Sequence, residues 1–514
     1  MAQQTRSVAI IGGGTAGWLT AGILASAVRE SGVTVTLVES PTVASIGVGE
    51  GTWPTMRRSL KRMGIRETDF IRRCNASLKQ GARFSRWAKD VPEDFYYHPL
   101  VLPEGRSEVN LGPHWASGAR GQSFAASVCA QERVCEAGLS PKQITTAEYD
   151  GVLNYAYHLD AGLFADFLRE HCVERLGVKH VLADVVGVNS TPSGDICSVA
   201  TLSSDEIGAD FFVDCTGFRS LLLGRHFGVP FKSCKDILFI DTALAVQVPY
   251  EDEQAPIASH TISTAQEAGW IWDIGLWSRR GVGHVYSSAH TSEERARRRL
   301  YDYLRPAVPR CEELSVRKIG IEPGHRTRFW ERNCVAVGLS AGFLEPLEAS
   351  AILLIEIAAA AIADKFPNTR ESMDVLSRRF NAAFLYRWDR IIDFLKLHYV
   401  LSQRSDNSFW LDNRAAESVP GSLKELLTLW RYHDPWVDDL EHAIEVFPAA
   451  SYQYVLYGMG FDAQCERRAR PPRHSPTTDE LFQRNEALTR QLLARMPANR
   501  ALLDKIRRYG LQSV

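Results

Sequence analysis

The chain has 514 residues, 45% of them hydrophobic and 23% charged, which is ordinary for a globular protein of roughly three domains. Its formal net charge of −2 gives no electrostatic reason to expect nucleic acid or an anionic membrane as a partner. Its ten cysteines form no Cys-x-x-Cys pair, so zinc ribbons and thioredoxin-like sites find no support.

We expect a cytoplasmic protein with no membrane partner. Scattered cysteines fit reduced thiols. The first apolar run, residues 8–11, leads directly into glycines without a signal-cleavage pattern. The strongest later run, residues 351–363, contains Glu356 and is too short to span a bilayer.

The N-terminal segment predicts a strand, a helix and a second strand. Residues 7–11 are apolar and β-branched, a glycine turn follows, and a helix is expected over about 16–29. A second strand over 33–38 ends at Glu39. This is the opening of a βαβ unit.

The turn of this unit reads Gly12-x-Gly14-x-x-Gly17. The first glycine allows the tight turn, the second lets backbone approach a pyrophosphate, and the third permits close helix packing. Glu39, 22 residues after Gly17, is placed to accept ribose hydroxyls. Strand, helix and acid in this register predict a dinucleotide site at the helix N-terminus.

Further elements follow along the chain. Helices are expected over 55–63 and 66–79, the second closing at Gly81. Short strands separated by turns are expected between 180 and 290, among them 181–186 and 211–214, and again at 334–338.

After Ser350 the pattern becomes helical. Apolar residues recur at intervals of three and four, the stripe of a core-facing helix: Phe380, Phe384, Trp388, Ile391, Ile392 and Leu395. Residues 467–473 are the best linker candidate, and an amphipathic helix is expected over about 479–495.

The dinucleotide is expected to be FAD. Asp214-Cys215-Thr216-Gly217 resembles the second dinucleotide-contacting turn of flavoprotein monooxygenases. No second glycine fingerprint marks a nicotinamide domain, since the tract at 46–52 has the wrong spacing. The reducing equivalents are therefore expected to come from elsewhere.

Six motifs together resemble flavin-dependent tryptophan halogenases, and they occur in that family's order. They are Gly12–Trp18, Gly47-Val48-Gly49-Glu50, Asn75-Ala76-Ser77-Leu78-Lys79, Asp214–Arg219, Trp270-Ile271-Trp272 and Gly342–Glu348.

The resemblance implies an α/β fold of the flavin-monooxygenase type. Residues 1–360 would form a Rossmann-like FAD-binding module with an inserted β-sheet, interleaved with the substrate region. Residues 361–514 would form a mainly helical, substrate-binding cap.

The resemblance also implies the cofactors and the overall reaction. FADH2, supplied by a separate NADH-dependent flavin reductase, and O2 would convert bromide or chloride into hypohalous acid. No metal ligand is expected. The implied FAD-binding residues are Gly12, Gly13, Gly14, Thr15, Ala16, Gly17, Glu39, Ser40, Ile46, Val48, Gly51, Leu339 and Ile352.

Lys79 would capture the hypohalous acid after it passes through an internal tunnel. A desolvated amine loses its preference for the charged form and becomes nucleophilic, which allows a covalent haloamine. A protonated lysine would instead donate a hydrogen bond to hypohalous acid, and the sequence leaves both open. The alternative is a purely structural role, in which a lysine in the last helical turn complements the helix dipole.

Glu348 is the second implied catalytic residue, near Lys79, where it would orient the reactive halogen and take the ring proton. Glu345 competes for this role, but the family pattern favours the carboxylate directly before the small residues. Without a role in catalysis, Glu348 would simply stabilise a helix N-terminus.

The implied halide site uses the backbone N–H groups of Ser350 and Ala351, which lie in the first turn of an apolar helix. The sequence reads Glu-Ala-Ser-Ala where the family usually reads Glu-Ser-Thr-Gly. The backbone N–H groups are present whatever the side chains are, whereas the sequence does not decide between chloride and bromide.

Trp270 and Trp272 point to one side of a strand, because alternate residues share a face. In the family these residues lie near the flavin and keep substrate away from it; the alternative is two core aromatics. Gly275 replaces the family's usual proline.

The implied substrate residues depart from the tryptophan-specific pattern. His98 is kept, Leu100 stands where phenylalanine is usual, and Tyr452 stands where tryptophan is usual. Phe447 stands where an acid often meets the substrate ammonium. Because burying an unpaired charge is costly, we expect an indole-type aromatic rather than free tryptophan. Plain core packing is the alternative for these aromatics.

Two other functions stay open at this point: an aromatic monooxygenase, and a non-catalytic relative that binds FAD or indole. The latter would bind FAD yet transfer no halogen. The sequence leaves a homodimer open as well.

Overall fold

The computed structural model describes residues 4–43, 49–106, 108–118, 121–203, 205–442, 444–461 and 476–512. The chain divides into two compact units of three segments each. Unit 1 comprises Met1–Ala76, Leu159–Cys234 and Glu322–Trp388, and unit 2 comprises Ser77–His158, Lys235–Ile321 and Asp389–Val514. Within the described residues, every helix is too short or too polar to cross a bilayer.

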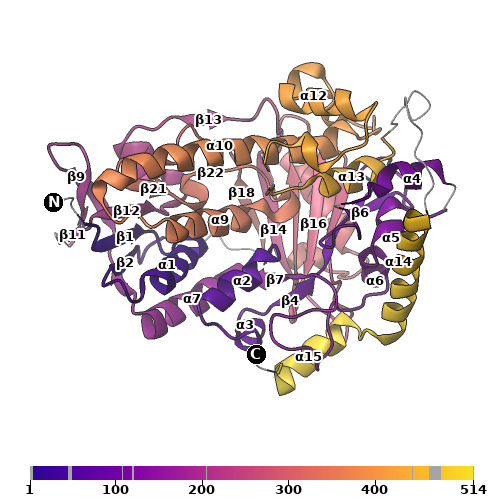
Figure 1. Ribbon diagram of the computed structural model, residues 1–514, viewed down its shortest axis with the longest axis horizontal. Helices are drawn as coiled ribbons and strands as arrows, with labels where there is room; N and C mark the ends of the chain where they lie inside the picture. Colours follow the sequence, from indigo (N-terminus) through magenta and orange to yellow (C-terminus); the bar gives the residue numbers. More distant parts are fainter. Residues whose placement is uncertain are drawn as a thin grey trace. The chain divides into compact units, whose positions relative to one another are not determined.

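A parallel sheet forms the centre of unit 1 (Figure 1). Its order is β20-β21-β12-β1-β2-β8, and only the edge strand β20 runs antiparallel. Apolar runs suit this sheet because helices and loops cover parallel strands on both faces. The strands are β1 (Ser7–Ile11), β2 (Thr34–Glu39), β8 (Lys179–Leu182), β12 (Phe211–Asp214), β20 (Trp330–Glu331) and β21 (Cys334–Ala336).

The predicted βαβ opening is confirmed. Helix α1 (Thr15–Val28) joins β1 to β2 and packs against α7 (Ala161–Leu176) and α9 (Ser350–Asp364). The expected strand at 211–214 is β12, and that at 334–338 is β21. The expected strand at 181–186 is instead divided between β8 and β9, with a break between Leu182 and Val185.

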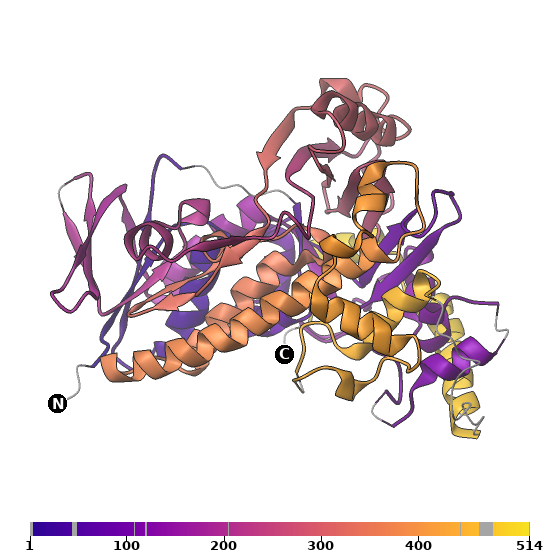
Figure 2. The same cartoon turned by 90° about the horizontal axis from the view of Figure 1, so that it is seen from above.

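Smaller elements complete unit 1. The short strands are β3 (Gly49–Gly51), β9 (Val185–Ser190), β10 (Ile196–Thr201), β11 (Glu206–Gly208), β13 (Phe231–Ser233), β19 (Gly324–Arg326) and β22 (Gly342–Phe343). The remaining helices are α2 (Thr55–Arg62), α3 (Glu67–Arg73), η1 (Gly217–Arg219), η2 (Leu221–His226), η4 (Gly338–Ser340) and η5 (Leu347–Ala349). Helix α10 (Arg370–Val400), the long orange helix of Figure 2, contributes residues to both units.

The expected helix over 66–79 is wrong. Helix α3 ends at Arg73, Asn75 has a left-handed backbone at φ 52°, and residues 77–79 form strand β4. A residue in this conformation stops a helix, and the freed backbone then pairs with another strand. Lys79 therefore lies on a strand, and the helix-dipole reading of this lysine is wrong as well.

A seven-stranded sheet dominates unit 2, in the order β18-β14-β17-β16-β15-β5-β6. Its neighbours are antiparallel except for β15 and β5. The strands are β5 (Gly81–Ser85), β6 (Phe95–Pro99), β14 (Thr242–Pro249), β15 (Thr261–Gln266), β16 (Gly269–Gly275), β17 (Arg279–Tyr286) and β18 (Val316–Gly320). Two of these strands come from Ser77–His158 and five from Lys235–Ile321, and both segments are inserted between parts of unit 1, as expected for an inserted sheet.

A second, small ladder in unit 2 pairs β4 (Ser77–Lys79) with β7 (Ala156–Asp160). Helices of the unit are α4 (Leu111–Ser117), α5 (Phe124–Val128), α6 (Gln131–Glu136), α8 (Glu293–Leu304), η3 (Cys311–Glu313), α11 (Ser408–Asp412), η6 (Ala416–Ser418), α12 (Gly421–Trp430), η7 (Val437–Asp439), α13 (Ala449–Gly458), α14 (Pro476–Arg495) and α15 (Asn499–Tyr509). The expected helices after Ser350 are confirmed as α10 and α14, and the stripe from Phe380 to Leu395 is buried. The expected linker at 467–473 lies outside the described residues.

Candidate functional site

The glycine turn after β1 has the geometry of a phosphate-binding turn. Gly12 has φ 117°, and a Cβ on it would lie 2.1 Å from the carbonyl oxygen of Cys215. A Cβ on Gly17 would lie 1.8 Å from the Gly12 oxygen, so only glycine lets α1 start this close to the turn. A Cβ on Gly14 would meet no heavy atom of the described residues within 4 Å. The side of Gly14 therefore faces open space at the N-terminus of α1, where a pyrophosphate fits.

Glu39 closes the second strand beside this turn. Its side chain lies against Gly13, where a Cβ would be 2.3 Å from the glutamate Cγ and Cδ. Its Oε2 is 2.8 Å from Nε2 of His180, and the rings of Trp18 and His180 form a T-shaped contact with centroids 5.0 Å apart. A carboxylate at this strand end suits the ribose hydroxyls of a dinucleotide.

Two further segments of unit 1 meet the glycine turn. The end of β12 approaches through Cys215, as described above, and η4 approaches through Gly338. A Cβ on Gly338 would lie 2.6 Å from Cβ of Ala16. Leu339 follows in η4, and Ile352 is buried in the first turn of α9.

The other expected FAD residues are distributed as follows. Gly51 ends β3, and Ser40 donates a hydrogen bond to Oδ1 of Asp184. Ile46 and Val48 lie outside the described residues. These residues present a glycine cradle, a helix N-terminus and a ribose-type acid, which together fit FAD.

Glu348 lies on a strained turn directly before α9. Both Glu348 and Ala349 have left-handed backbones, at φ 63° and 53°. Each such residue costs on the order of 1–3 kcal/mol, and such strain is common at functional sites. Nε1 of Trp53 donates to the Glu348 carbonyl at 2.8 Å, which holds the turn. Glu348 is 8% exposed and Glu345 is 1% exposed.

Helix α9 begins at Ser350, so the N–H groups of Ser350 and Ala351 lie in its first turn, where helical geometry provides no intrahelical acceptor. The positive end of the helix dipole lies there too. Further along, the buried Glu356 accepts hydrogen bonds from Thr55 at 3.0 Å and Ser59 at 2.5 Å. Burial raises the pKa of Glu356 from 4.5 to about 7.

In unit 2, Lys79 ends strand β4 and is only 3% exposed. It lies opposite Ala156 of β7, and Ser77 lies opposite His158. The next residue, Gln80, accepts a hydrogen bond from the Leu100 N–H at 3.0 Å and donates from its own N–H to Ser259 at 2.6 Å. Lys79 is thus held in a buried ladder whose continuation is bonded to Leu100.

Trp270 and Trp272 lie on β16, buried, with ring centroids 6.5 Å apart in an edge-to-face arrangement. The indole of Trp272 lies over Gly283 of the neighbouring strand, where a Cβ would be 2.1 Å from the ring. Gly275 ends the same strand and accepts a hydrogen bond from Oγ of Ser77, two residues before Lys79. The strand of the tryptophans is therefore bonded to the strand of the lysine.

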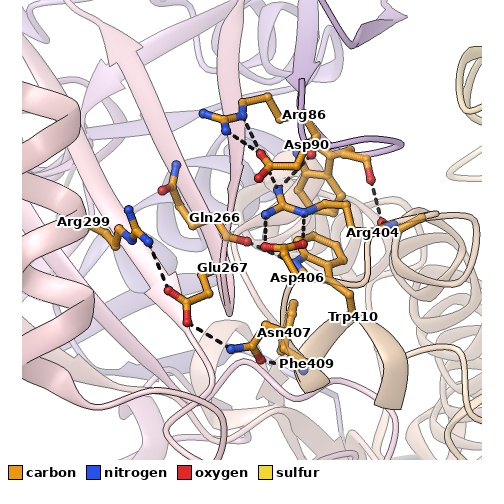
Figure 3. A network of polar contacts seen from close by, with 12 residues as sticks. Arg86, Asp90, Gln266, Glu267, Arg299, Arg404, Asp406, Asn407, Phe409 and Trp410 are labelled. Carbon is orange, nitrogen blue, oxygen red and sulfur yellow. Dashed lines mark hydrogen bonds and ion pairs between the residues drawn. The ribbon is translucent and has the colours of Figure 1, made fainter. Parts of the chain in front are cut away.

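The turn of the β15–β16 hairpin is fixed at its outer end (Figure 3). Glu267 accepts from Asn407 at 3.2 Å and from Arg299 at 3.3 Å, and Nε1 of Trp410 donates to Gln266 at 3.1 Å. Nearby, the buried Arg404 binds Asp406 through two hydrogen bonds and donates to the Arg86 carbonyl at 3.0 Å. These contacts fix the turn that precedes the strand of the two tryptophans.

An aromatic cluster in unit 2 contains three of the four expected substrate residues. Phe447 stacks on Phe394 with ring centroids 3.9 Å apart, and Tyr452 meets Phe394 edge-on at 5.0 Å. His98 contacts Phe394 at 5.5 Å between ring centroids, and its Nε2 is 2.9 Å from Oγ of Ser451. The fourth residue, Leu100, follows β6 and is buried.

Several residues of these sites have a role that the sequence analysis above does not predict. Phe394 lies in the gap of the apolar stripe between Ile392 and Leu395, and only the fold brings it to the centre of the aromatic cluster. Trp53 and His158 come from segments without a recognisable motif. The helix end at Asn75 is predictable, because an asparagine after Arg72-Arg73-Cys74 is a typical left-handed residue at the end of a helix.

Comparison with known proteins identifies relatives along nearly the whole chain. The family model described as "Tryptophan halogenase" matches residues 7–471. The tryptophan 6-halogenase SttH of Streptomyces toxytricini is 36% identical over 474 residues, covering 88% of this chain and 89% of the relative. The tryptophan 7-halogenase RebH of Lentzea aerocolonigenes is 32% identical, covering 97% of this chain and 98% of the relative.

Solved structures give the same result. The crystal structure of a tryptophan halogenase from Shewanella frigidimarina is similar with a TM-score of 0.95 and 47% sequence identity, over 99% of both chains.

Proposed function

Since this chain belongs to the tryptophan halogenase family and is a flavin-dependent halogenase, we propose that it halogenates an indole-type aromatic through Lys79, with Glu348 as the proton acceptor. Its family uses reduced flavin, halide, an aromatic substrate and a separate flavin reductase. The burial of Lys79 at the end of strand β4, whose next residue Gln80 is hydrogen-bonded to Leu100, is the observation that carries the proposal.

Unit 1 would hold the cofactor and the halide. When bound there, FADH2 would supply two of the four electrons that reduce O2, and the halide would supply the other two and leave as hypohalous acid. The glycine turn would receive the pyrophosphate, Glu39 the ribose, and the N–H groups of Ser350 and Ala351 the halide. The strained backbone at Glu348 and Ala349 supports this role, because it presents the start of α9 in a fixed orientation.

Lys79 would receive the halogen in unit 2. Its exposed fraction of 3% means that bulk water has little access to the amine. In a site with little water, an electrophilic halogen species reacts with the substrate instead of being lost by hydrolysis. Trp270 and Trp272, held by the fixed hairpin, would keep the substrate away from the flavin.

Glu348 would accept the proton that the ring loses after halogenation. General-base catalysis of this kind contributes typically 10²–10⁴-fold. Of the two carboxylates before α9, Glu348 is the one on the strained turn, which supports its choice over Glu345.

The substrate would lack a free amino-acid group. The relatives named above are tryptophan halogenases, but here the position expected for an acid is Phe447, stacked within an aromatic cluster. An ammonium group buried against these rings would lose its hydration without gaining a carboxylate. An indole, or an indole carried by a larger molecule, avoids this cost.

The experiment compares indole with free tryptophan. Purified protein is incubated with FAD, a flavin reductase, NADH and bromide, and products are measured by mass spectrometry. We expect a product with the bromine isotope doublet, formed from indole at least ten times faster than from tryptophan. Reactions without bromide serve as the control. Faster bromination of free tryptophan would overturn the substrate proposal.

A further inference from the structure

His158 lies next to Lys79 on the same face of the β4–β7 ladder. In this antiparallel pair Ser77 lies opposite His158, and Lys79 lies opposite Ala156. Alternate residues of a strand point to the same face, so the side chains of Lys79 and His158 share one face as diagonal neighbours. Such neighbours have Cα atoms about 7–8 Å apart, which is within reach of long side chains.

The imidazole of His158 is fully buried and is held at one nitrogen only. Its Nε2 lies 2.8 Å from Oγ1 of Thr261, and its relative exposure is 0%. Among the described residues, its Nδ1 has no hydrogen-bond partner. Leaving a buried polar atom unpaired costs roughly 1–3 kcal/mol, so such an atom in a native structure needs a reason.

The environment keeps this imidazole neutral. Burial lowers the pKa of His158 well below 6.5. Electrostatic interactions with Lys79 and, to a smaller extent, with His260 lower it further. The pKa of His260 is itself lowered to about 3 by burial and by Arg83. Ser77 and Thr261, which face His158 from β4 and β15, are uncharged. The ladder therefore offers Lys79 a polar neighbour that carries no charge.

We propose that His158 is a positioning residue for Lys79, placing an uncharged hydrogen-bonding nitrogen beside the amine. This role rests on the proposed function of Lys79 in halogen transfer. A carboxylate at position 158 would hold Lys79 in an ion pair. An apolar ring there would take away the polar group that His158 places beside Lys79. A neutral imidazole, anchored through Thr261, leaves a polar group beside the lysine without doing either.

The first test measures how much hypohalous acid reaches the arene. The variants are His158→Phe, His158→Asp and His158→Gln, with His284→Phe as the matched control. His284 is also a buried histidine of unit 2, but its Nδ1 lies 2.8 Å from the carbonyl oxygen of Ala296, toward α8. Arene halogenation is compared with hypohalous acid trapped by a reactive 1,3-diketone, each per NADH consumed.

We expect His158→Phe and His158→Asp to lower arene halogenation at least tenfold while the trapped hypohalous acid stays within twofold. His158→Gln, which keeps a neutral polar group, should stay within threefold of the wild type, and His284→Phe should keep the wild-type ratio. The proposal would be overturned if all variants gave the same ratio of halogenated arene to trapped hypohalous acid, or if both of these products fell in parallel. A wild-type protein that halogenates no arene would instead refute the proposed function.

The second test needs no turnover. In the apoprotein, the rate at which Lys79 is acylated by acetic anhydride at pH 7.5 reports its neutral fraction, because only the neutral amine reacts. We expect His158→Phe to label at least fivefold faster than His158→Asp, with the labelling of the buried Lys142 and Lys396 unchanged as internal references. Equal labelling of Lys79 in the two variants would overturn the proposal whatever the enzyme's activity.

Discussion

Adding one methyl group at Gly14 should separate FAD binding from folding. A Cβ at this position meets no heavy atom within 4 Å in the part of the chain that the structure describes, and the backbone at φ −76° and ψ −175° is open to alanine. The free energy of unfolding of the apoprotein should therefore change by less than about 0.5 kcal/mol in Gly14→Ala. The methyl group would, however, occupy the space beside the amides where the pyrophosphate is expected. We expect the Kd for FAD to rise at least ~30-fold, which is about 2 kcal/mol.

Gly17→Ala is the matched comparison, because the same methyl group has no room there. Its Cβ would lie 1.8 Å from the Gly12 oxygen, so the turn or the helix must shift. Overpacking of this kind costs about 1–3 kcal/mol or more, which should appear as a lower free energy of unfolding without any cofactor.

Urea unfolding of the apoproteins and titration with FAD, followed by flavin fluorescence, measure the two effects. Wild-type FAD affinity in Gly14→Ala would refute the assigned position of the pyrophosphate. Wild-type stability in Gly17→Ala would refute the close packing of the turn.

Three further predictions concern other residues. Glu348→Gln should lower arene halogenation about 100-fold at unchanged FAD affinity, since only the proton acceptor is lost; an equal loss of FAD binding would contradict this role. Phe447→Glu should shift the ratio of tryptophan to indole bromination at least tenfold toward tryptophan, and should destabilise the protein because the stacking on Phe394 is lost; an unchanged ratio in the folded variant would contradict the substrate proposal. The raised pKa of Glu356 means that the folded state binds its proton more tightly than the unfolded state. This contribution to stability is fully present below pH 4.5 and is lost as pH rises through about 7. In urea unfolding, the free energy of unfolding should therefore fall less between pH 5.5 and pH 8 in Glu356→Gln than in the wild type.

The βαβ opening of unit 1 was predictable because its signals are local. Strand β1, helix α1 and strand β2 follow the apolar runs within one residue, and the glycines have the roles that their spacing predicts. The turn type, the helix start and the packing of Gly17 all depend on residues close together in sequence.

The surroundings of Lys79 were not predictable in the same way. The motif identified the lysine, but residues 77–79 have no strong strand propensity, and their pairing with β7 joins segments about 80 residues apart. Such pairing is set by tertiary structure rather than local preference. The same holds for Phe394, whose aromatic partners come from distant segments.

The role of Lys79 is tested most directly by Lys79→Ala, assayed for bromination of indole together with FAD affinity and trapped hypobromous acid. We predict at least a 100-fold loss of bromoindole, with FAD affinity and hypobromous acid formation retained. Bromoindole formed at the wild-type rate by this variant would contradict the account.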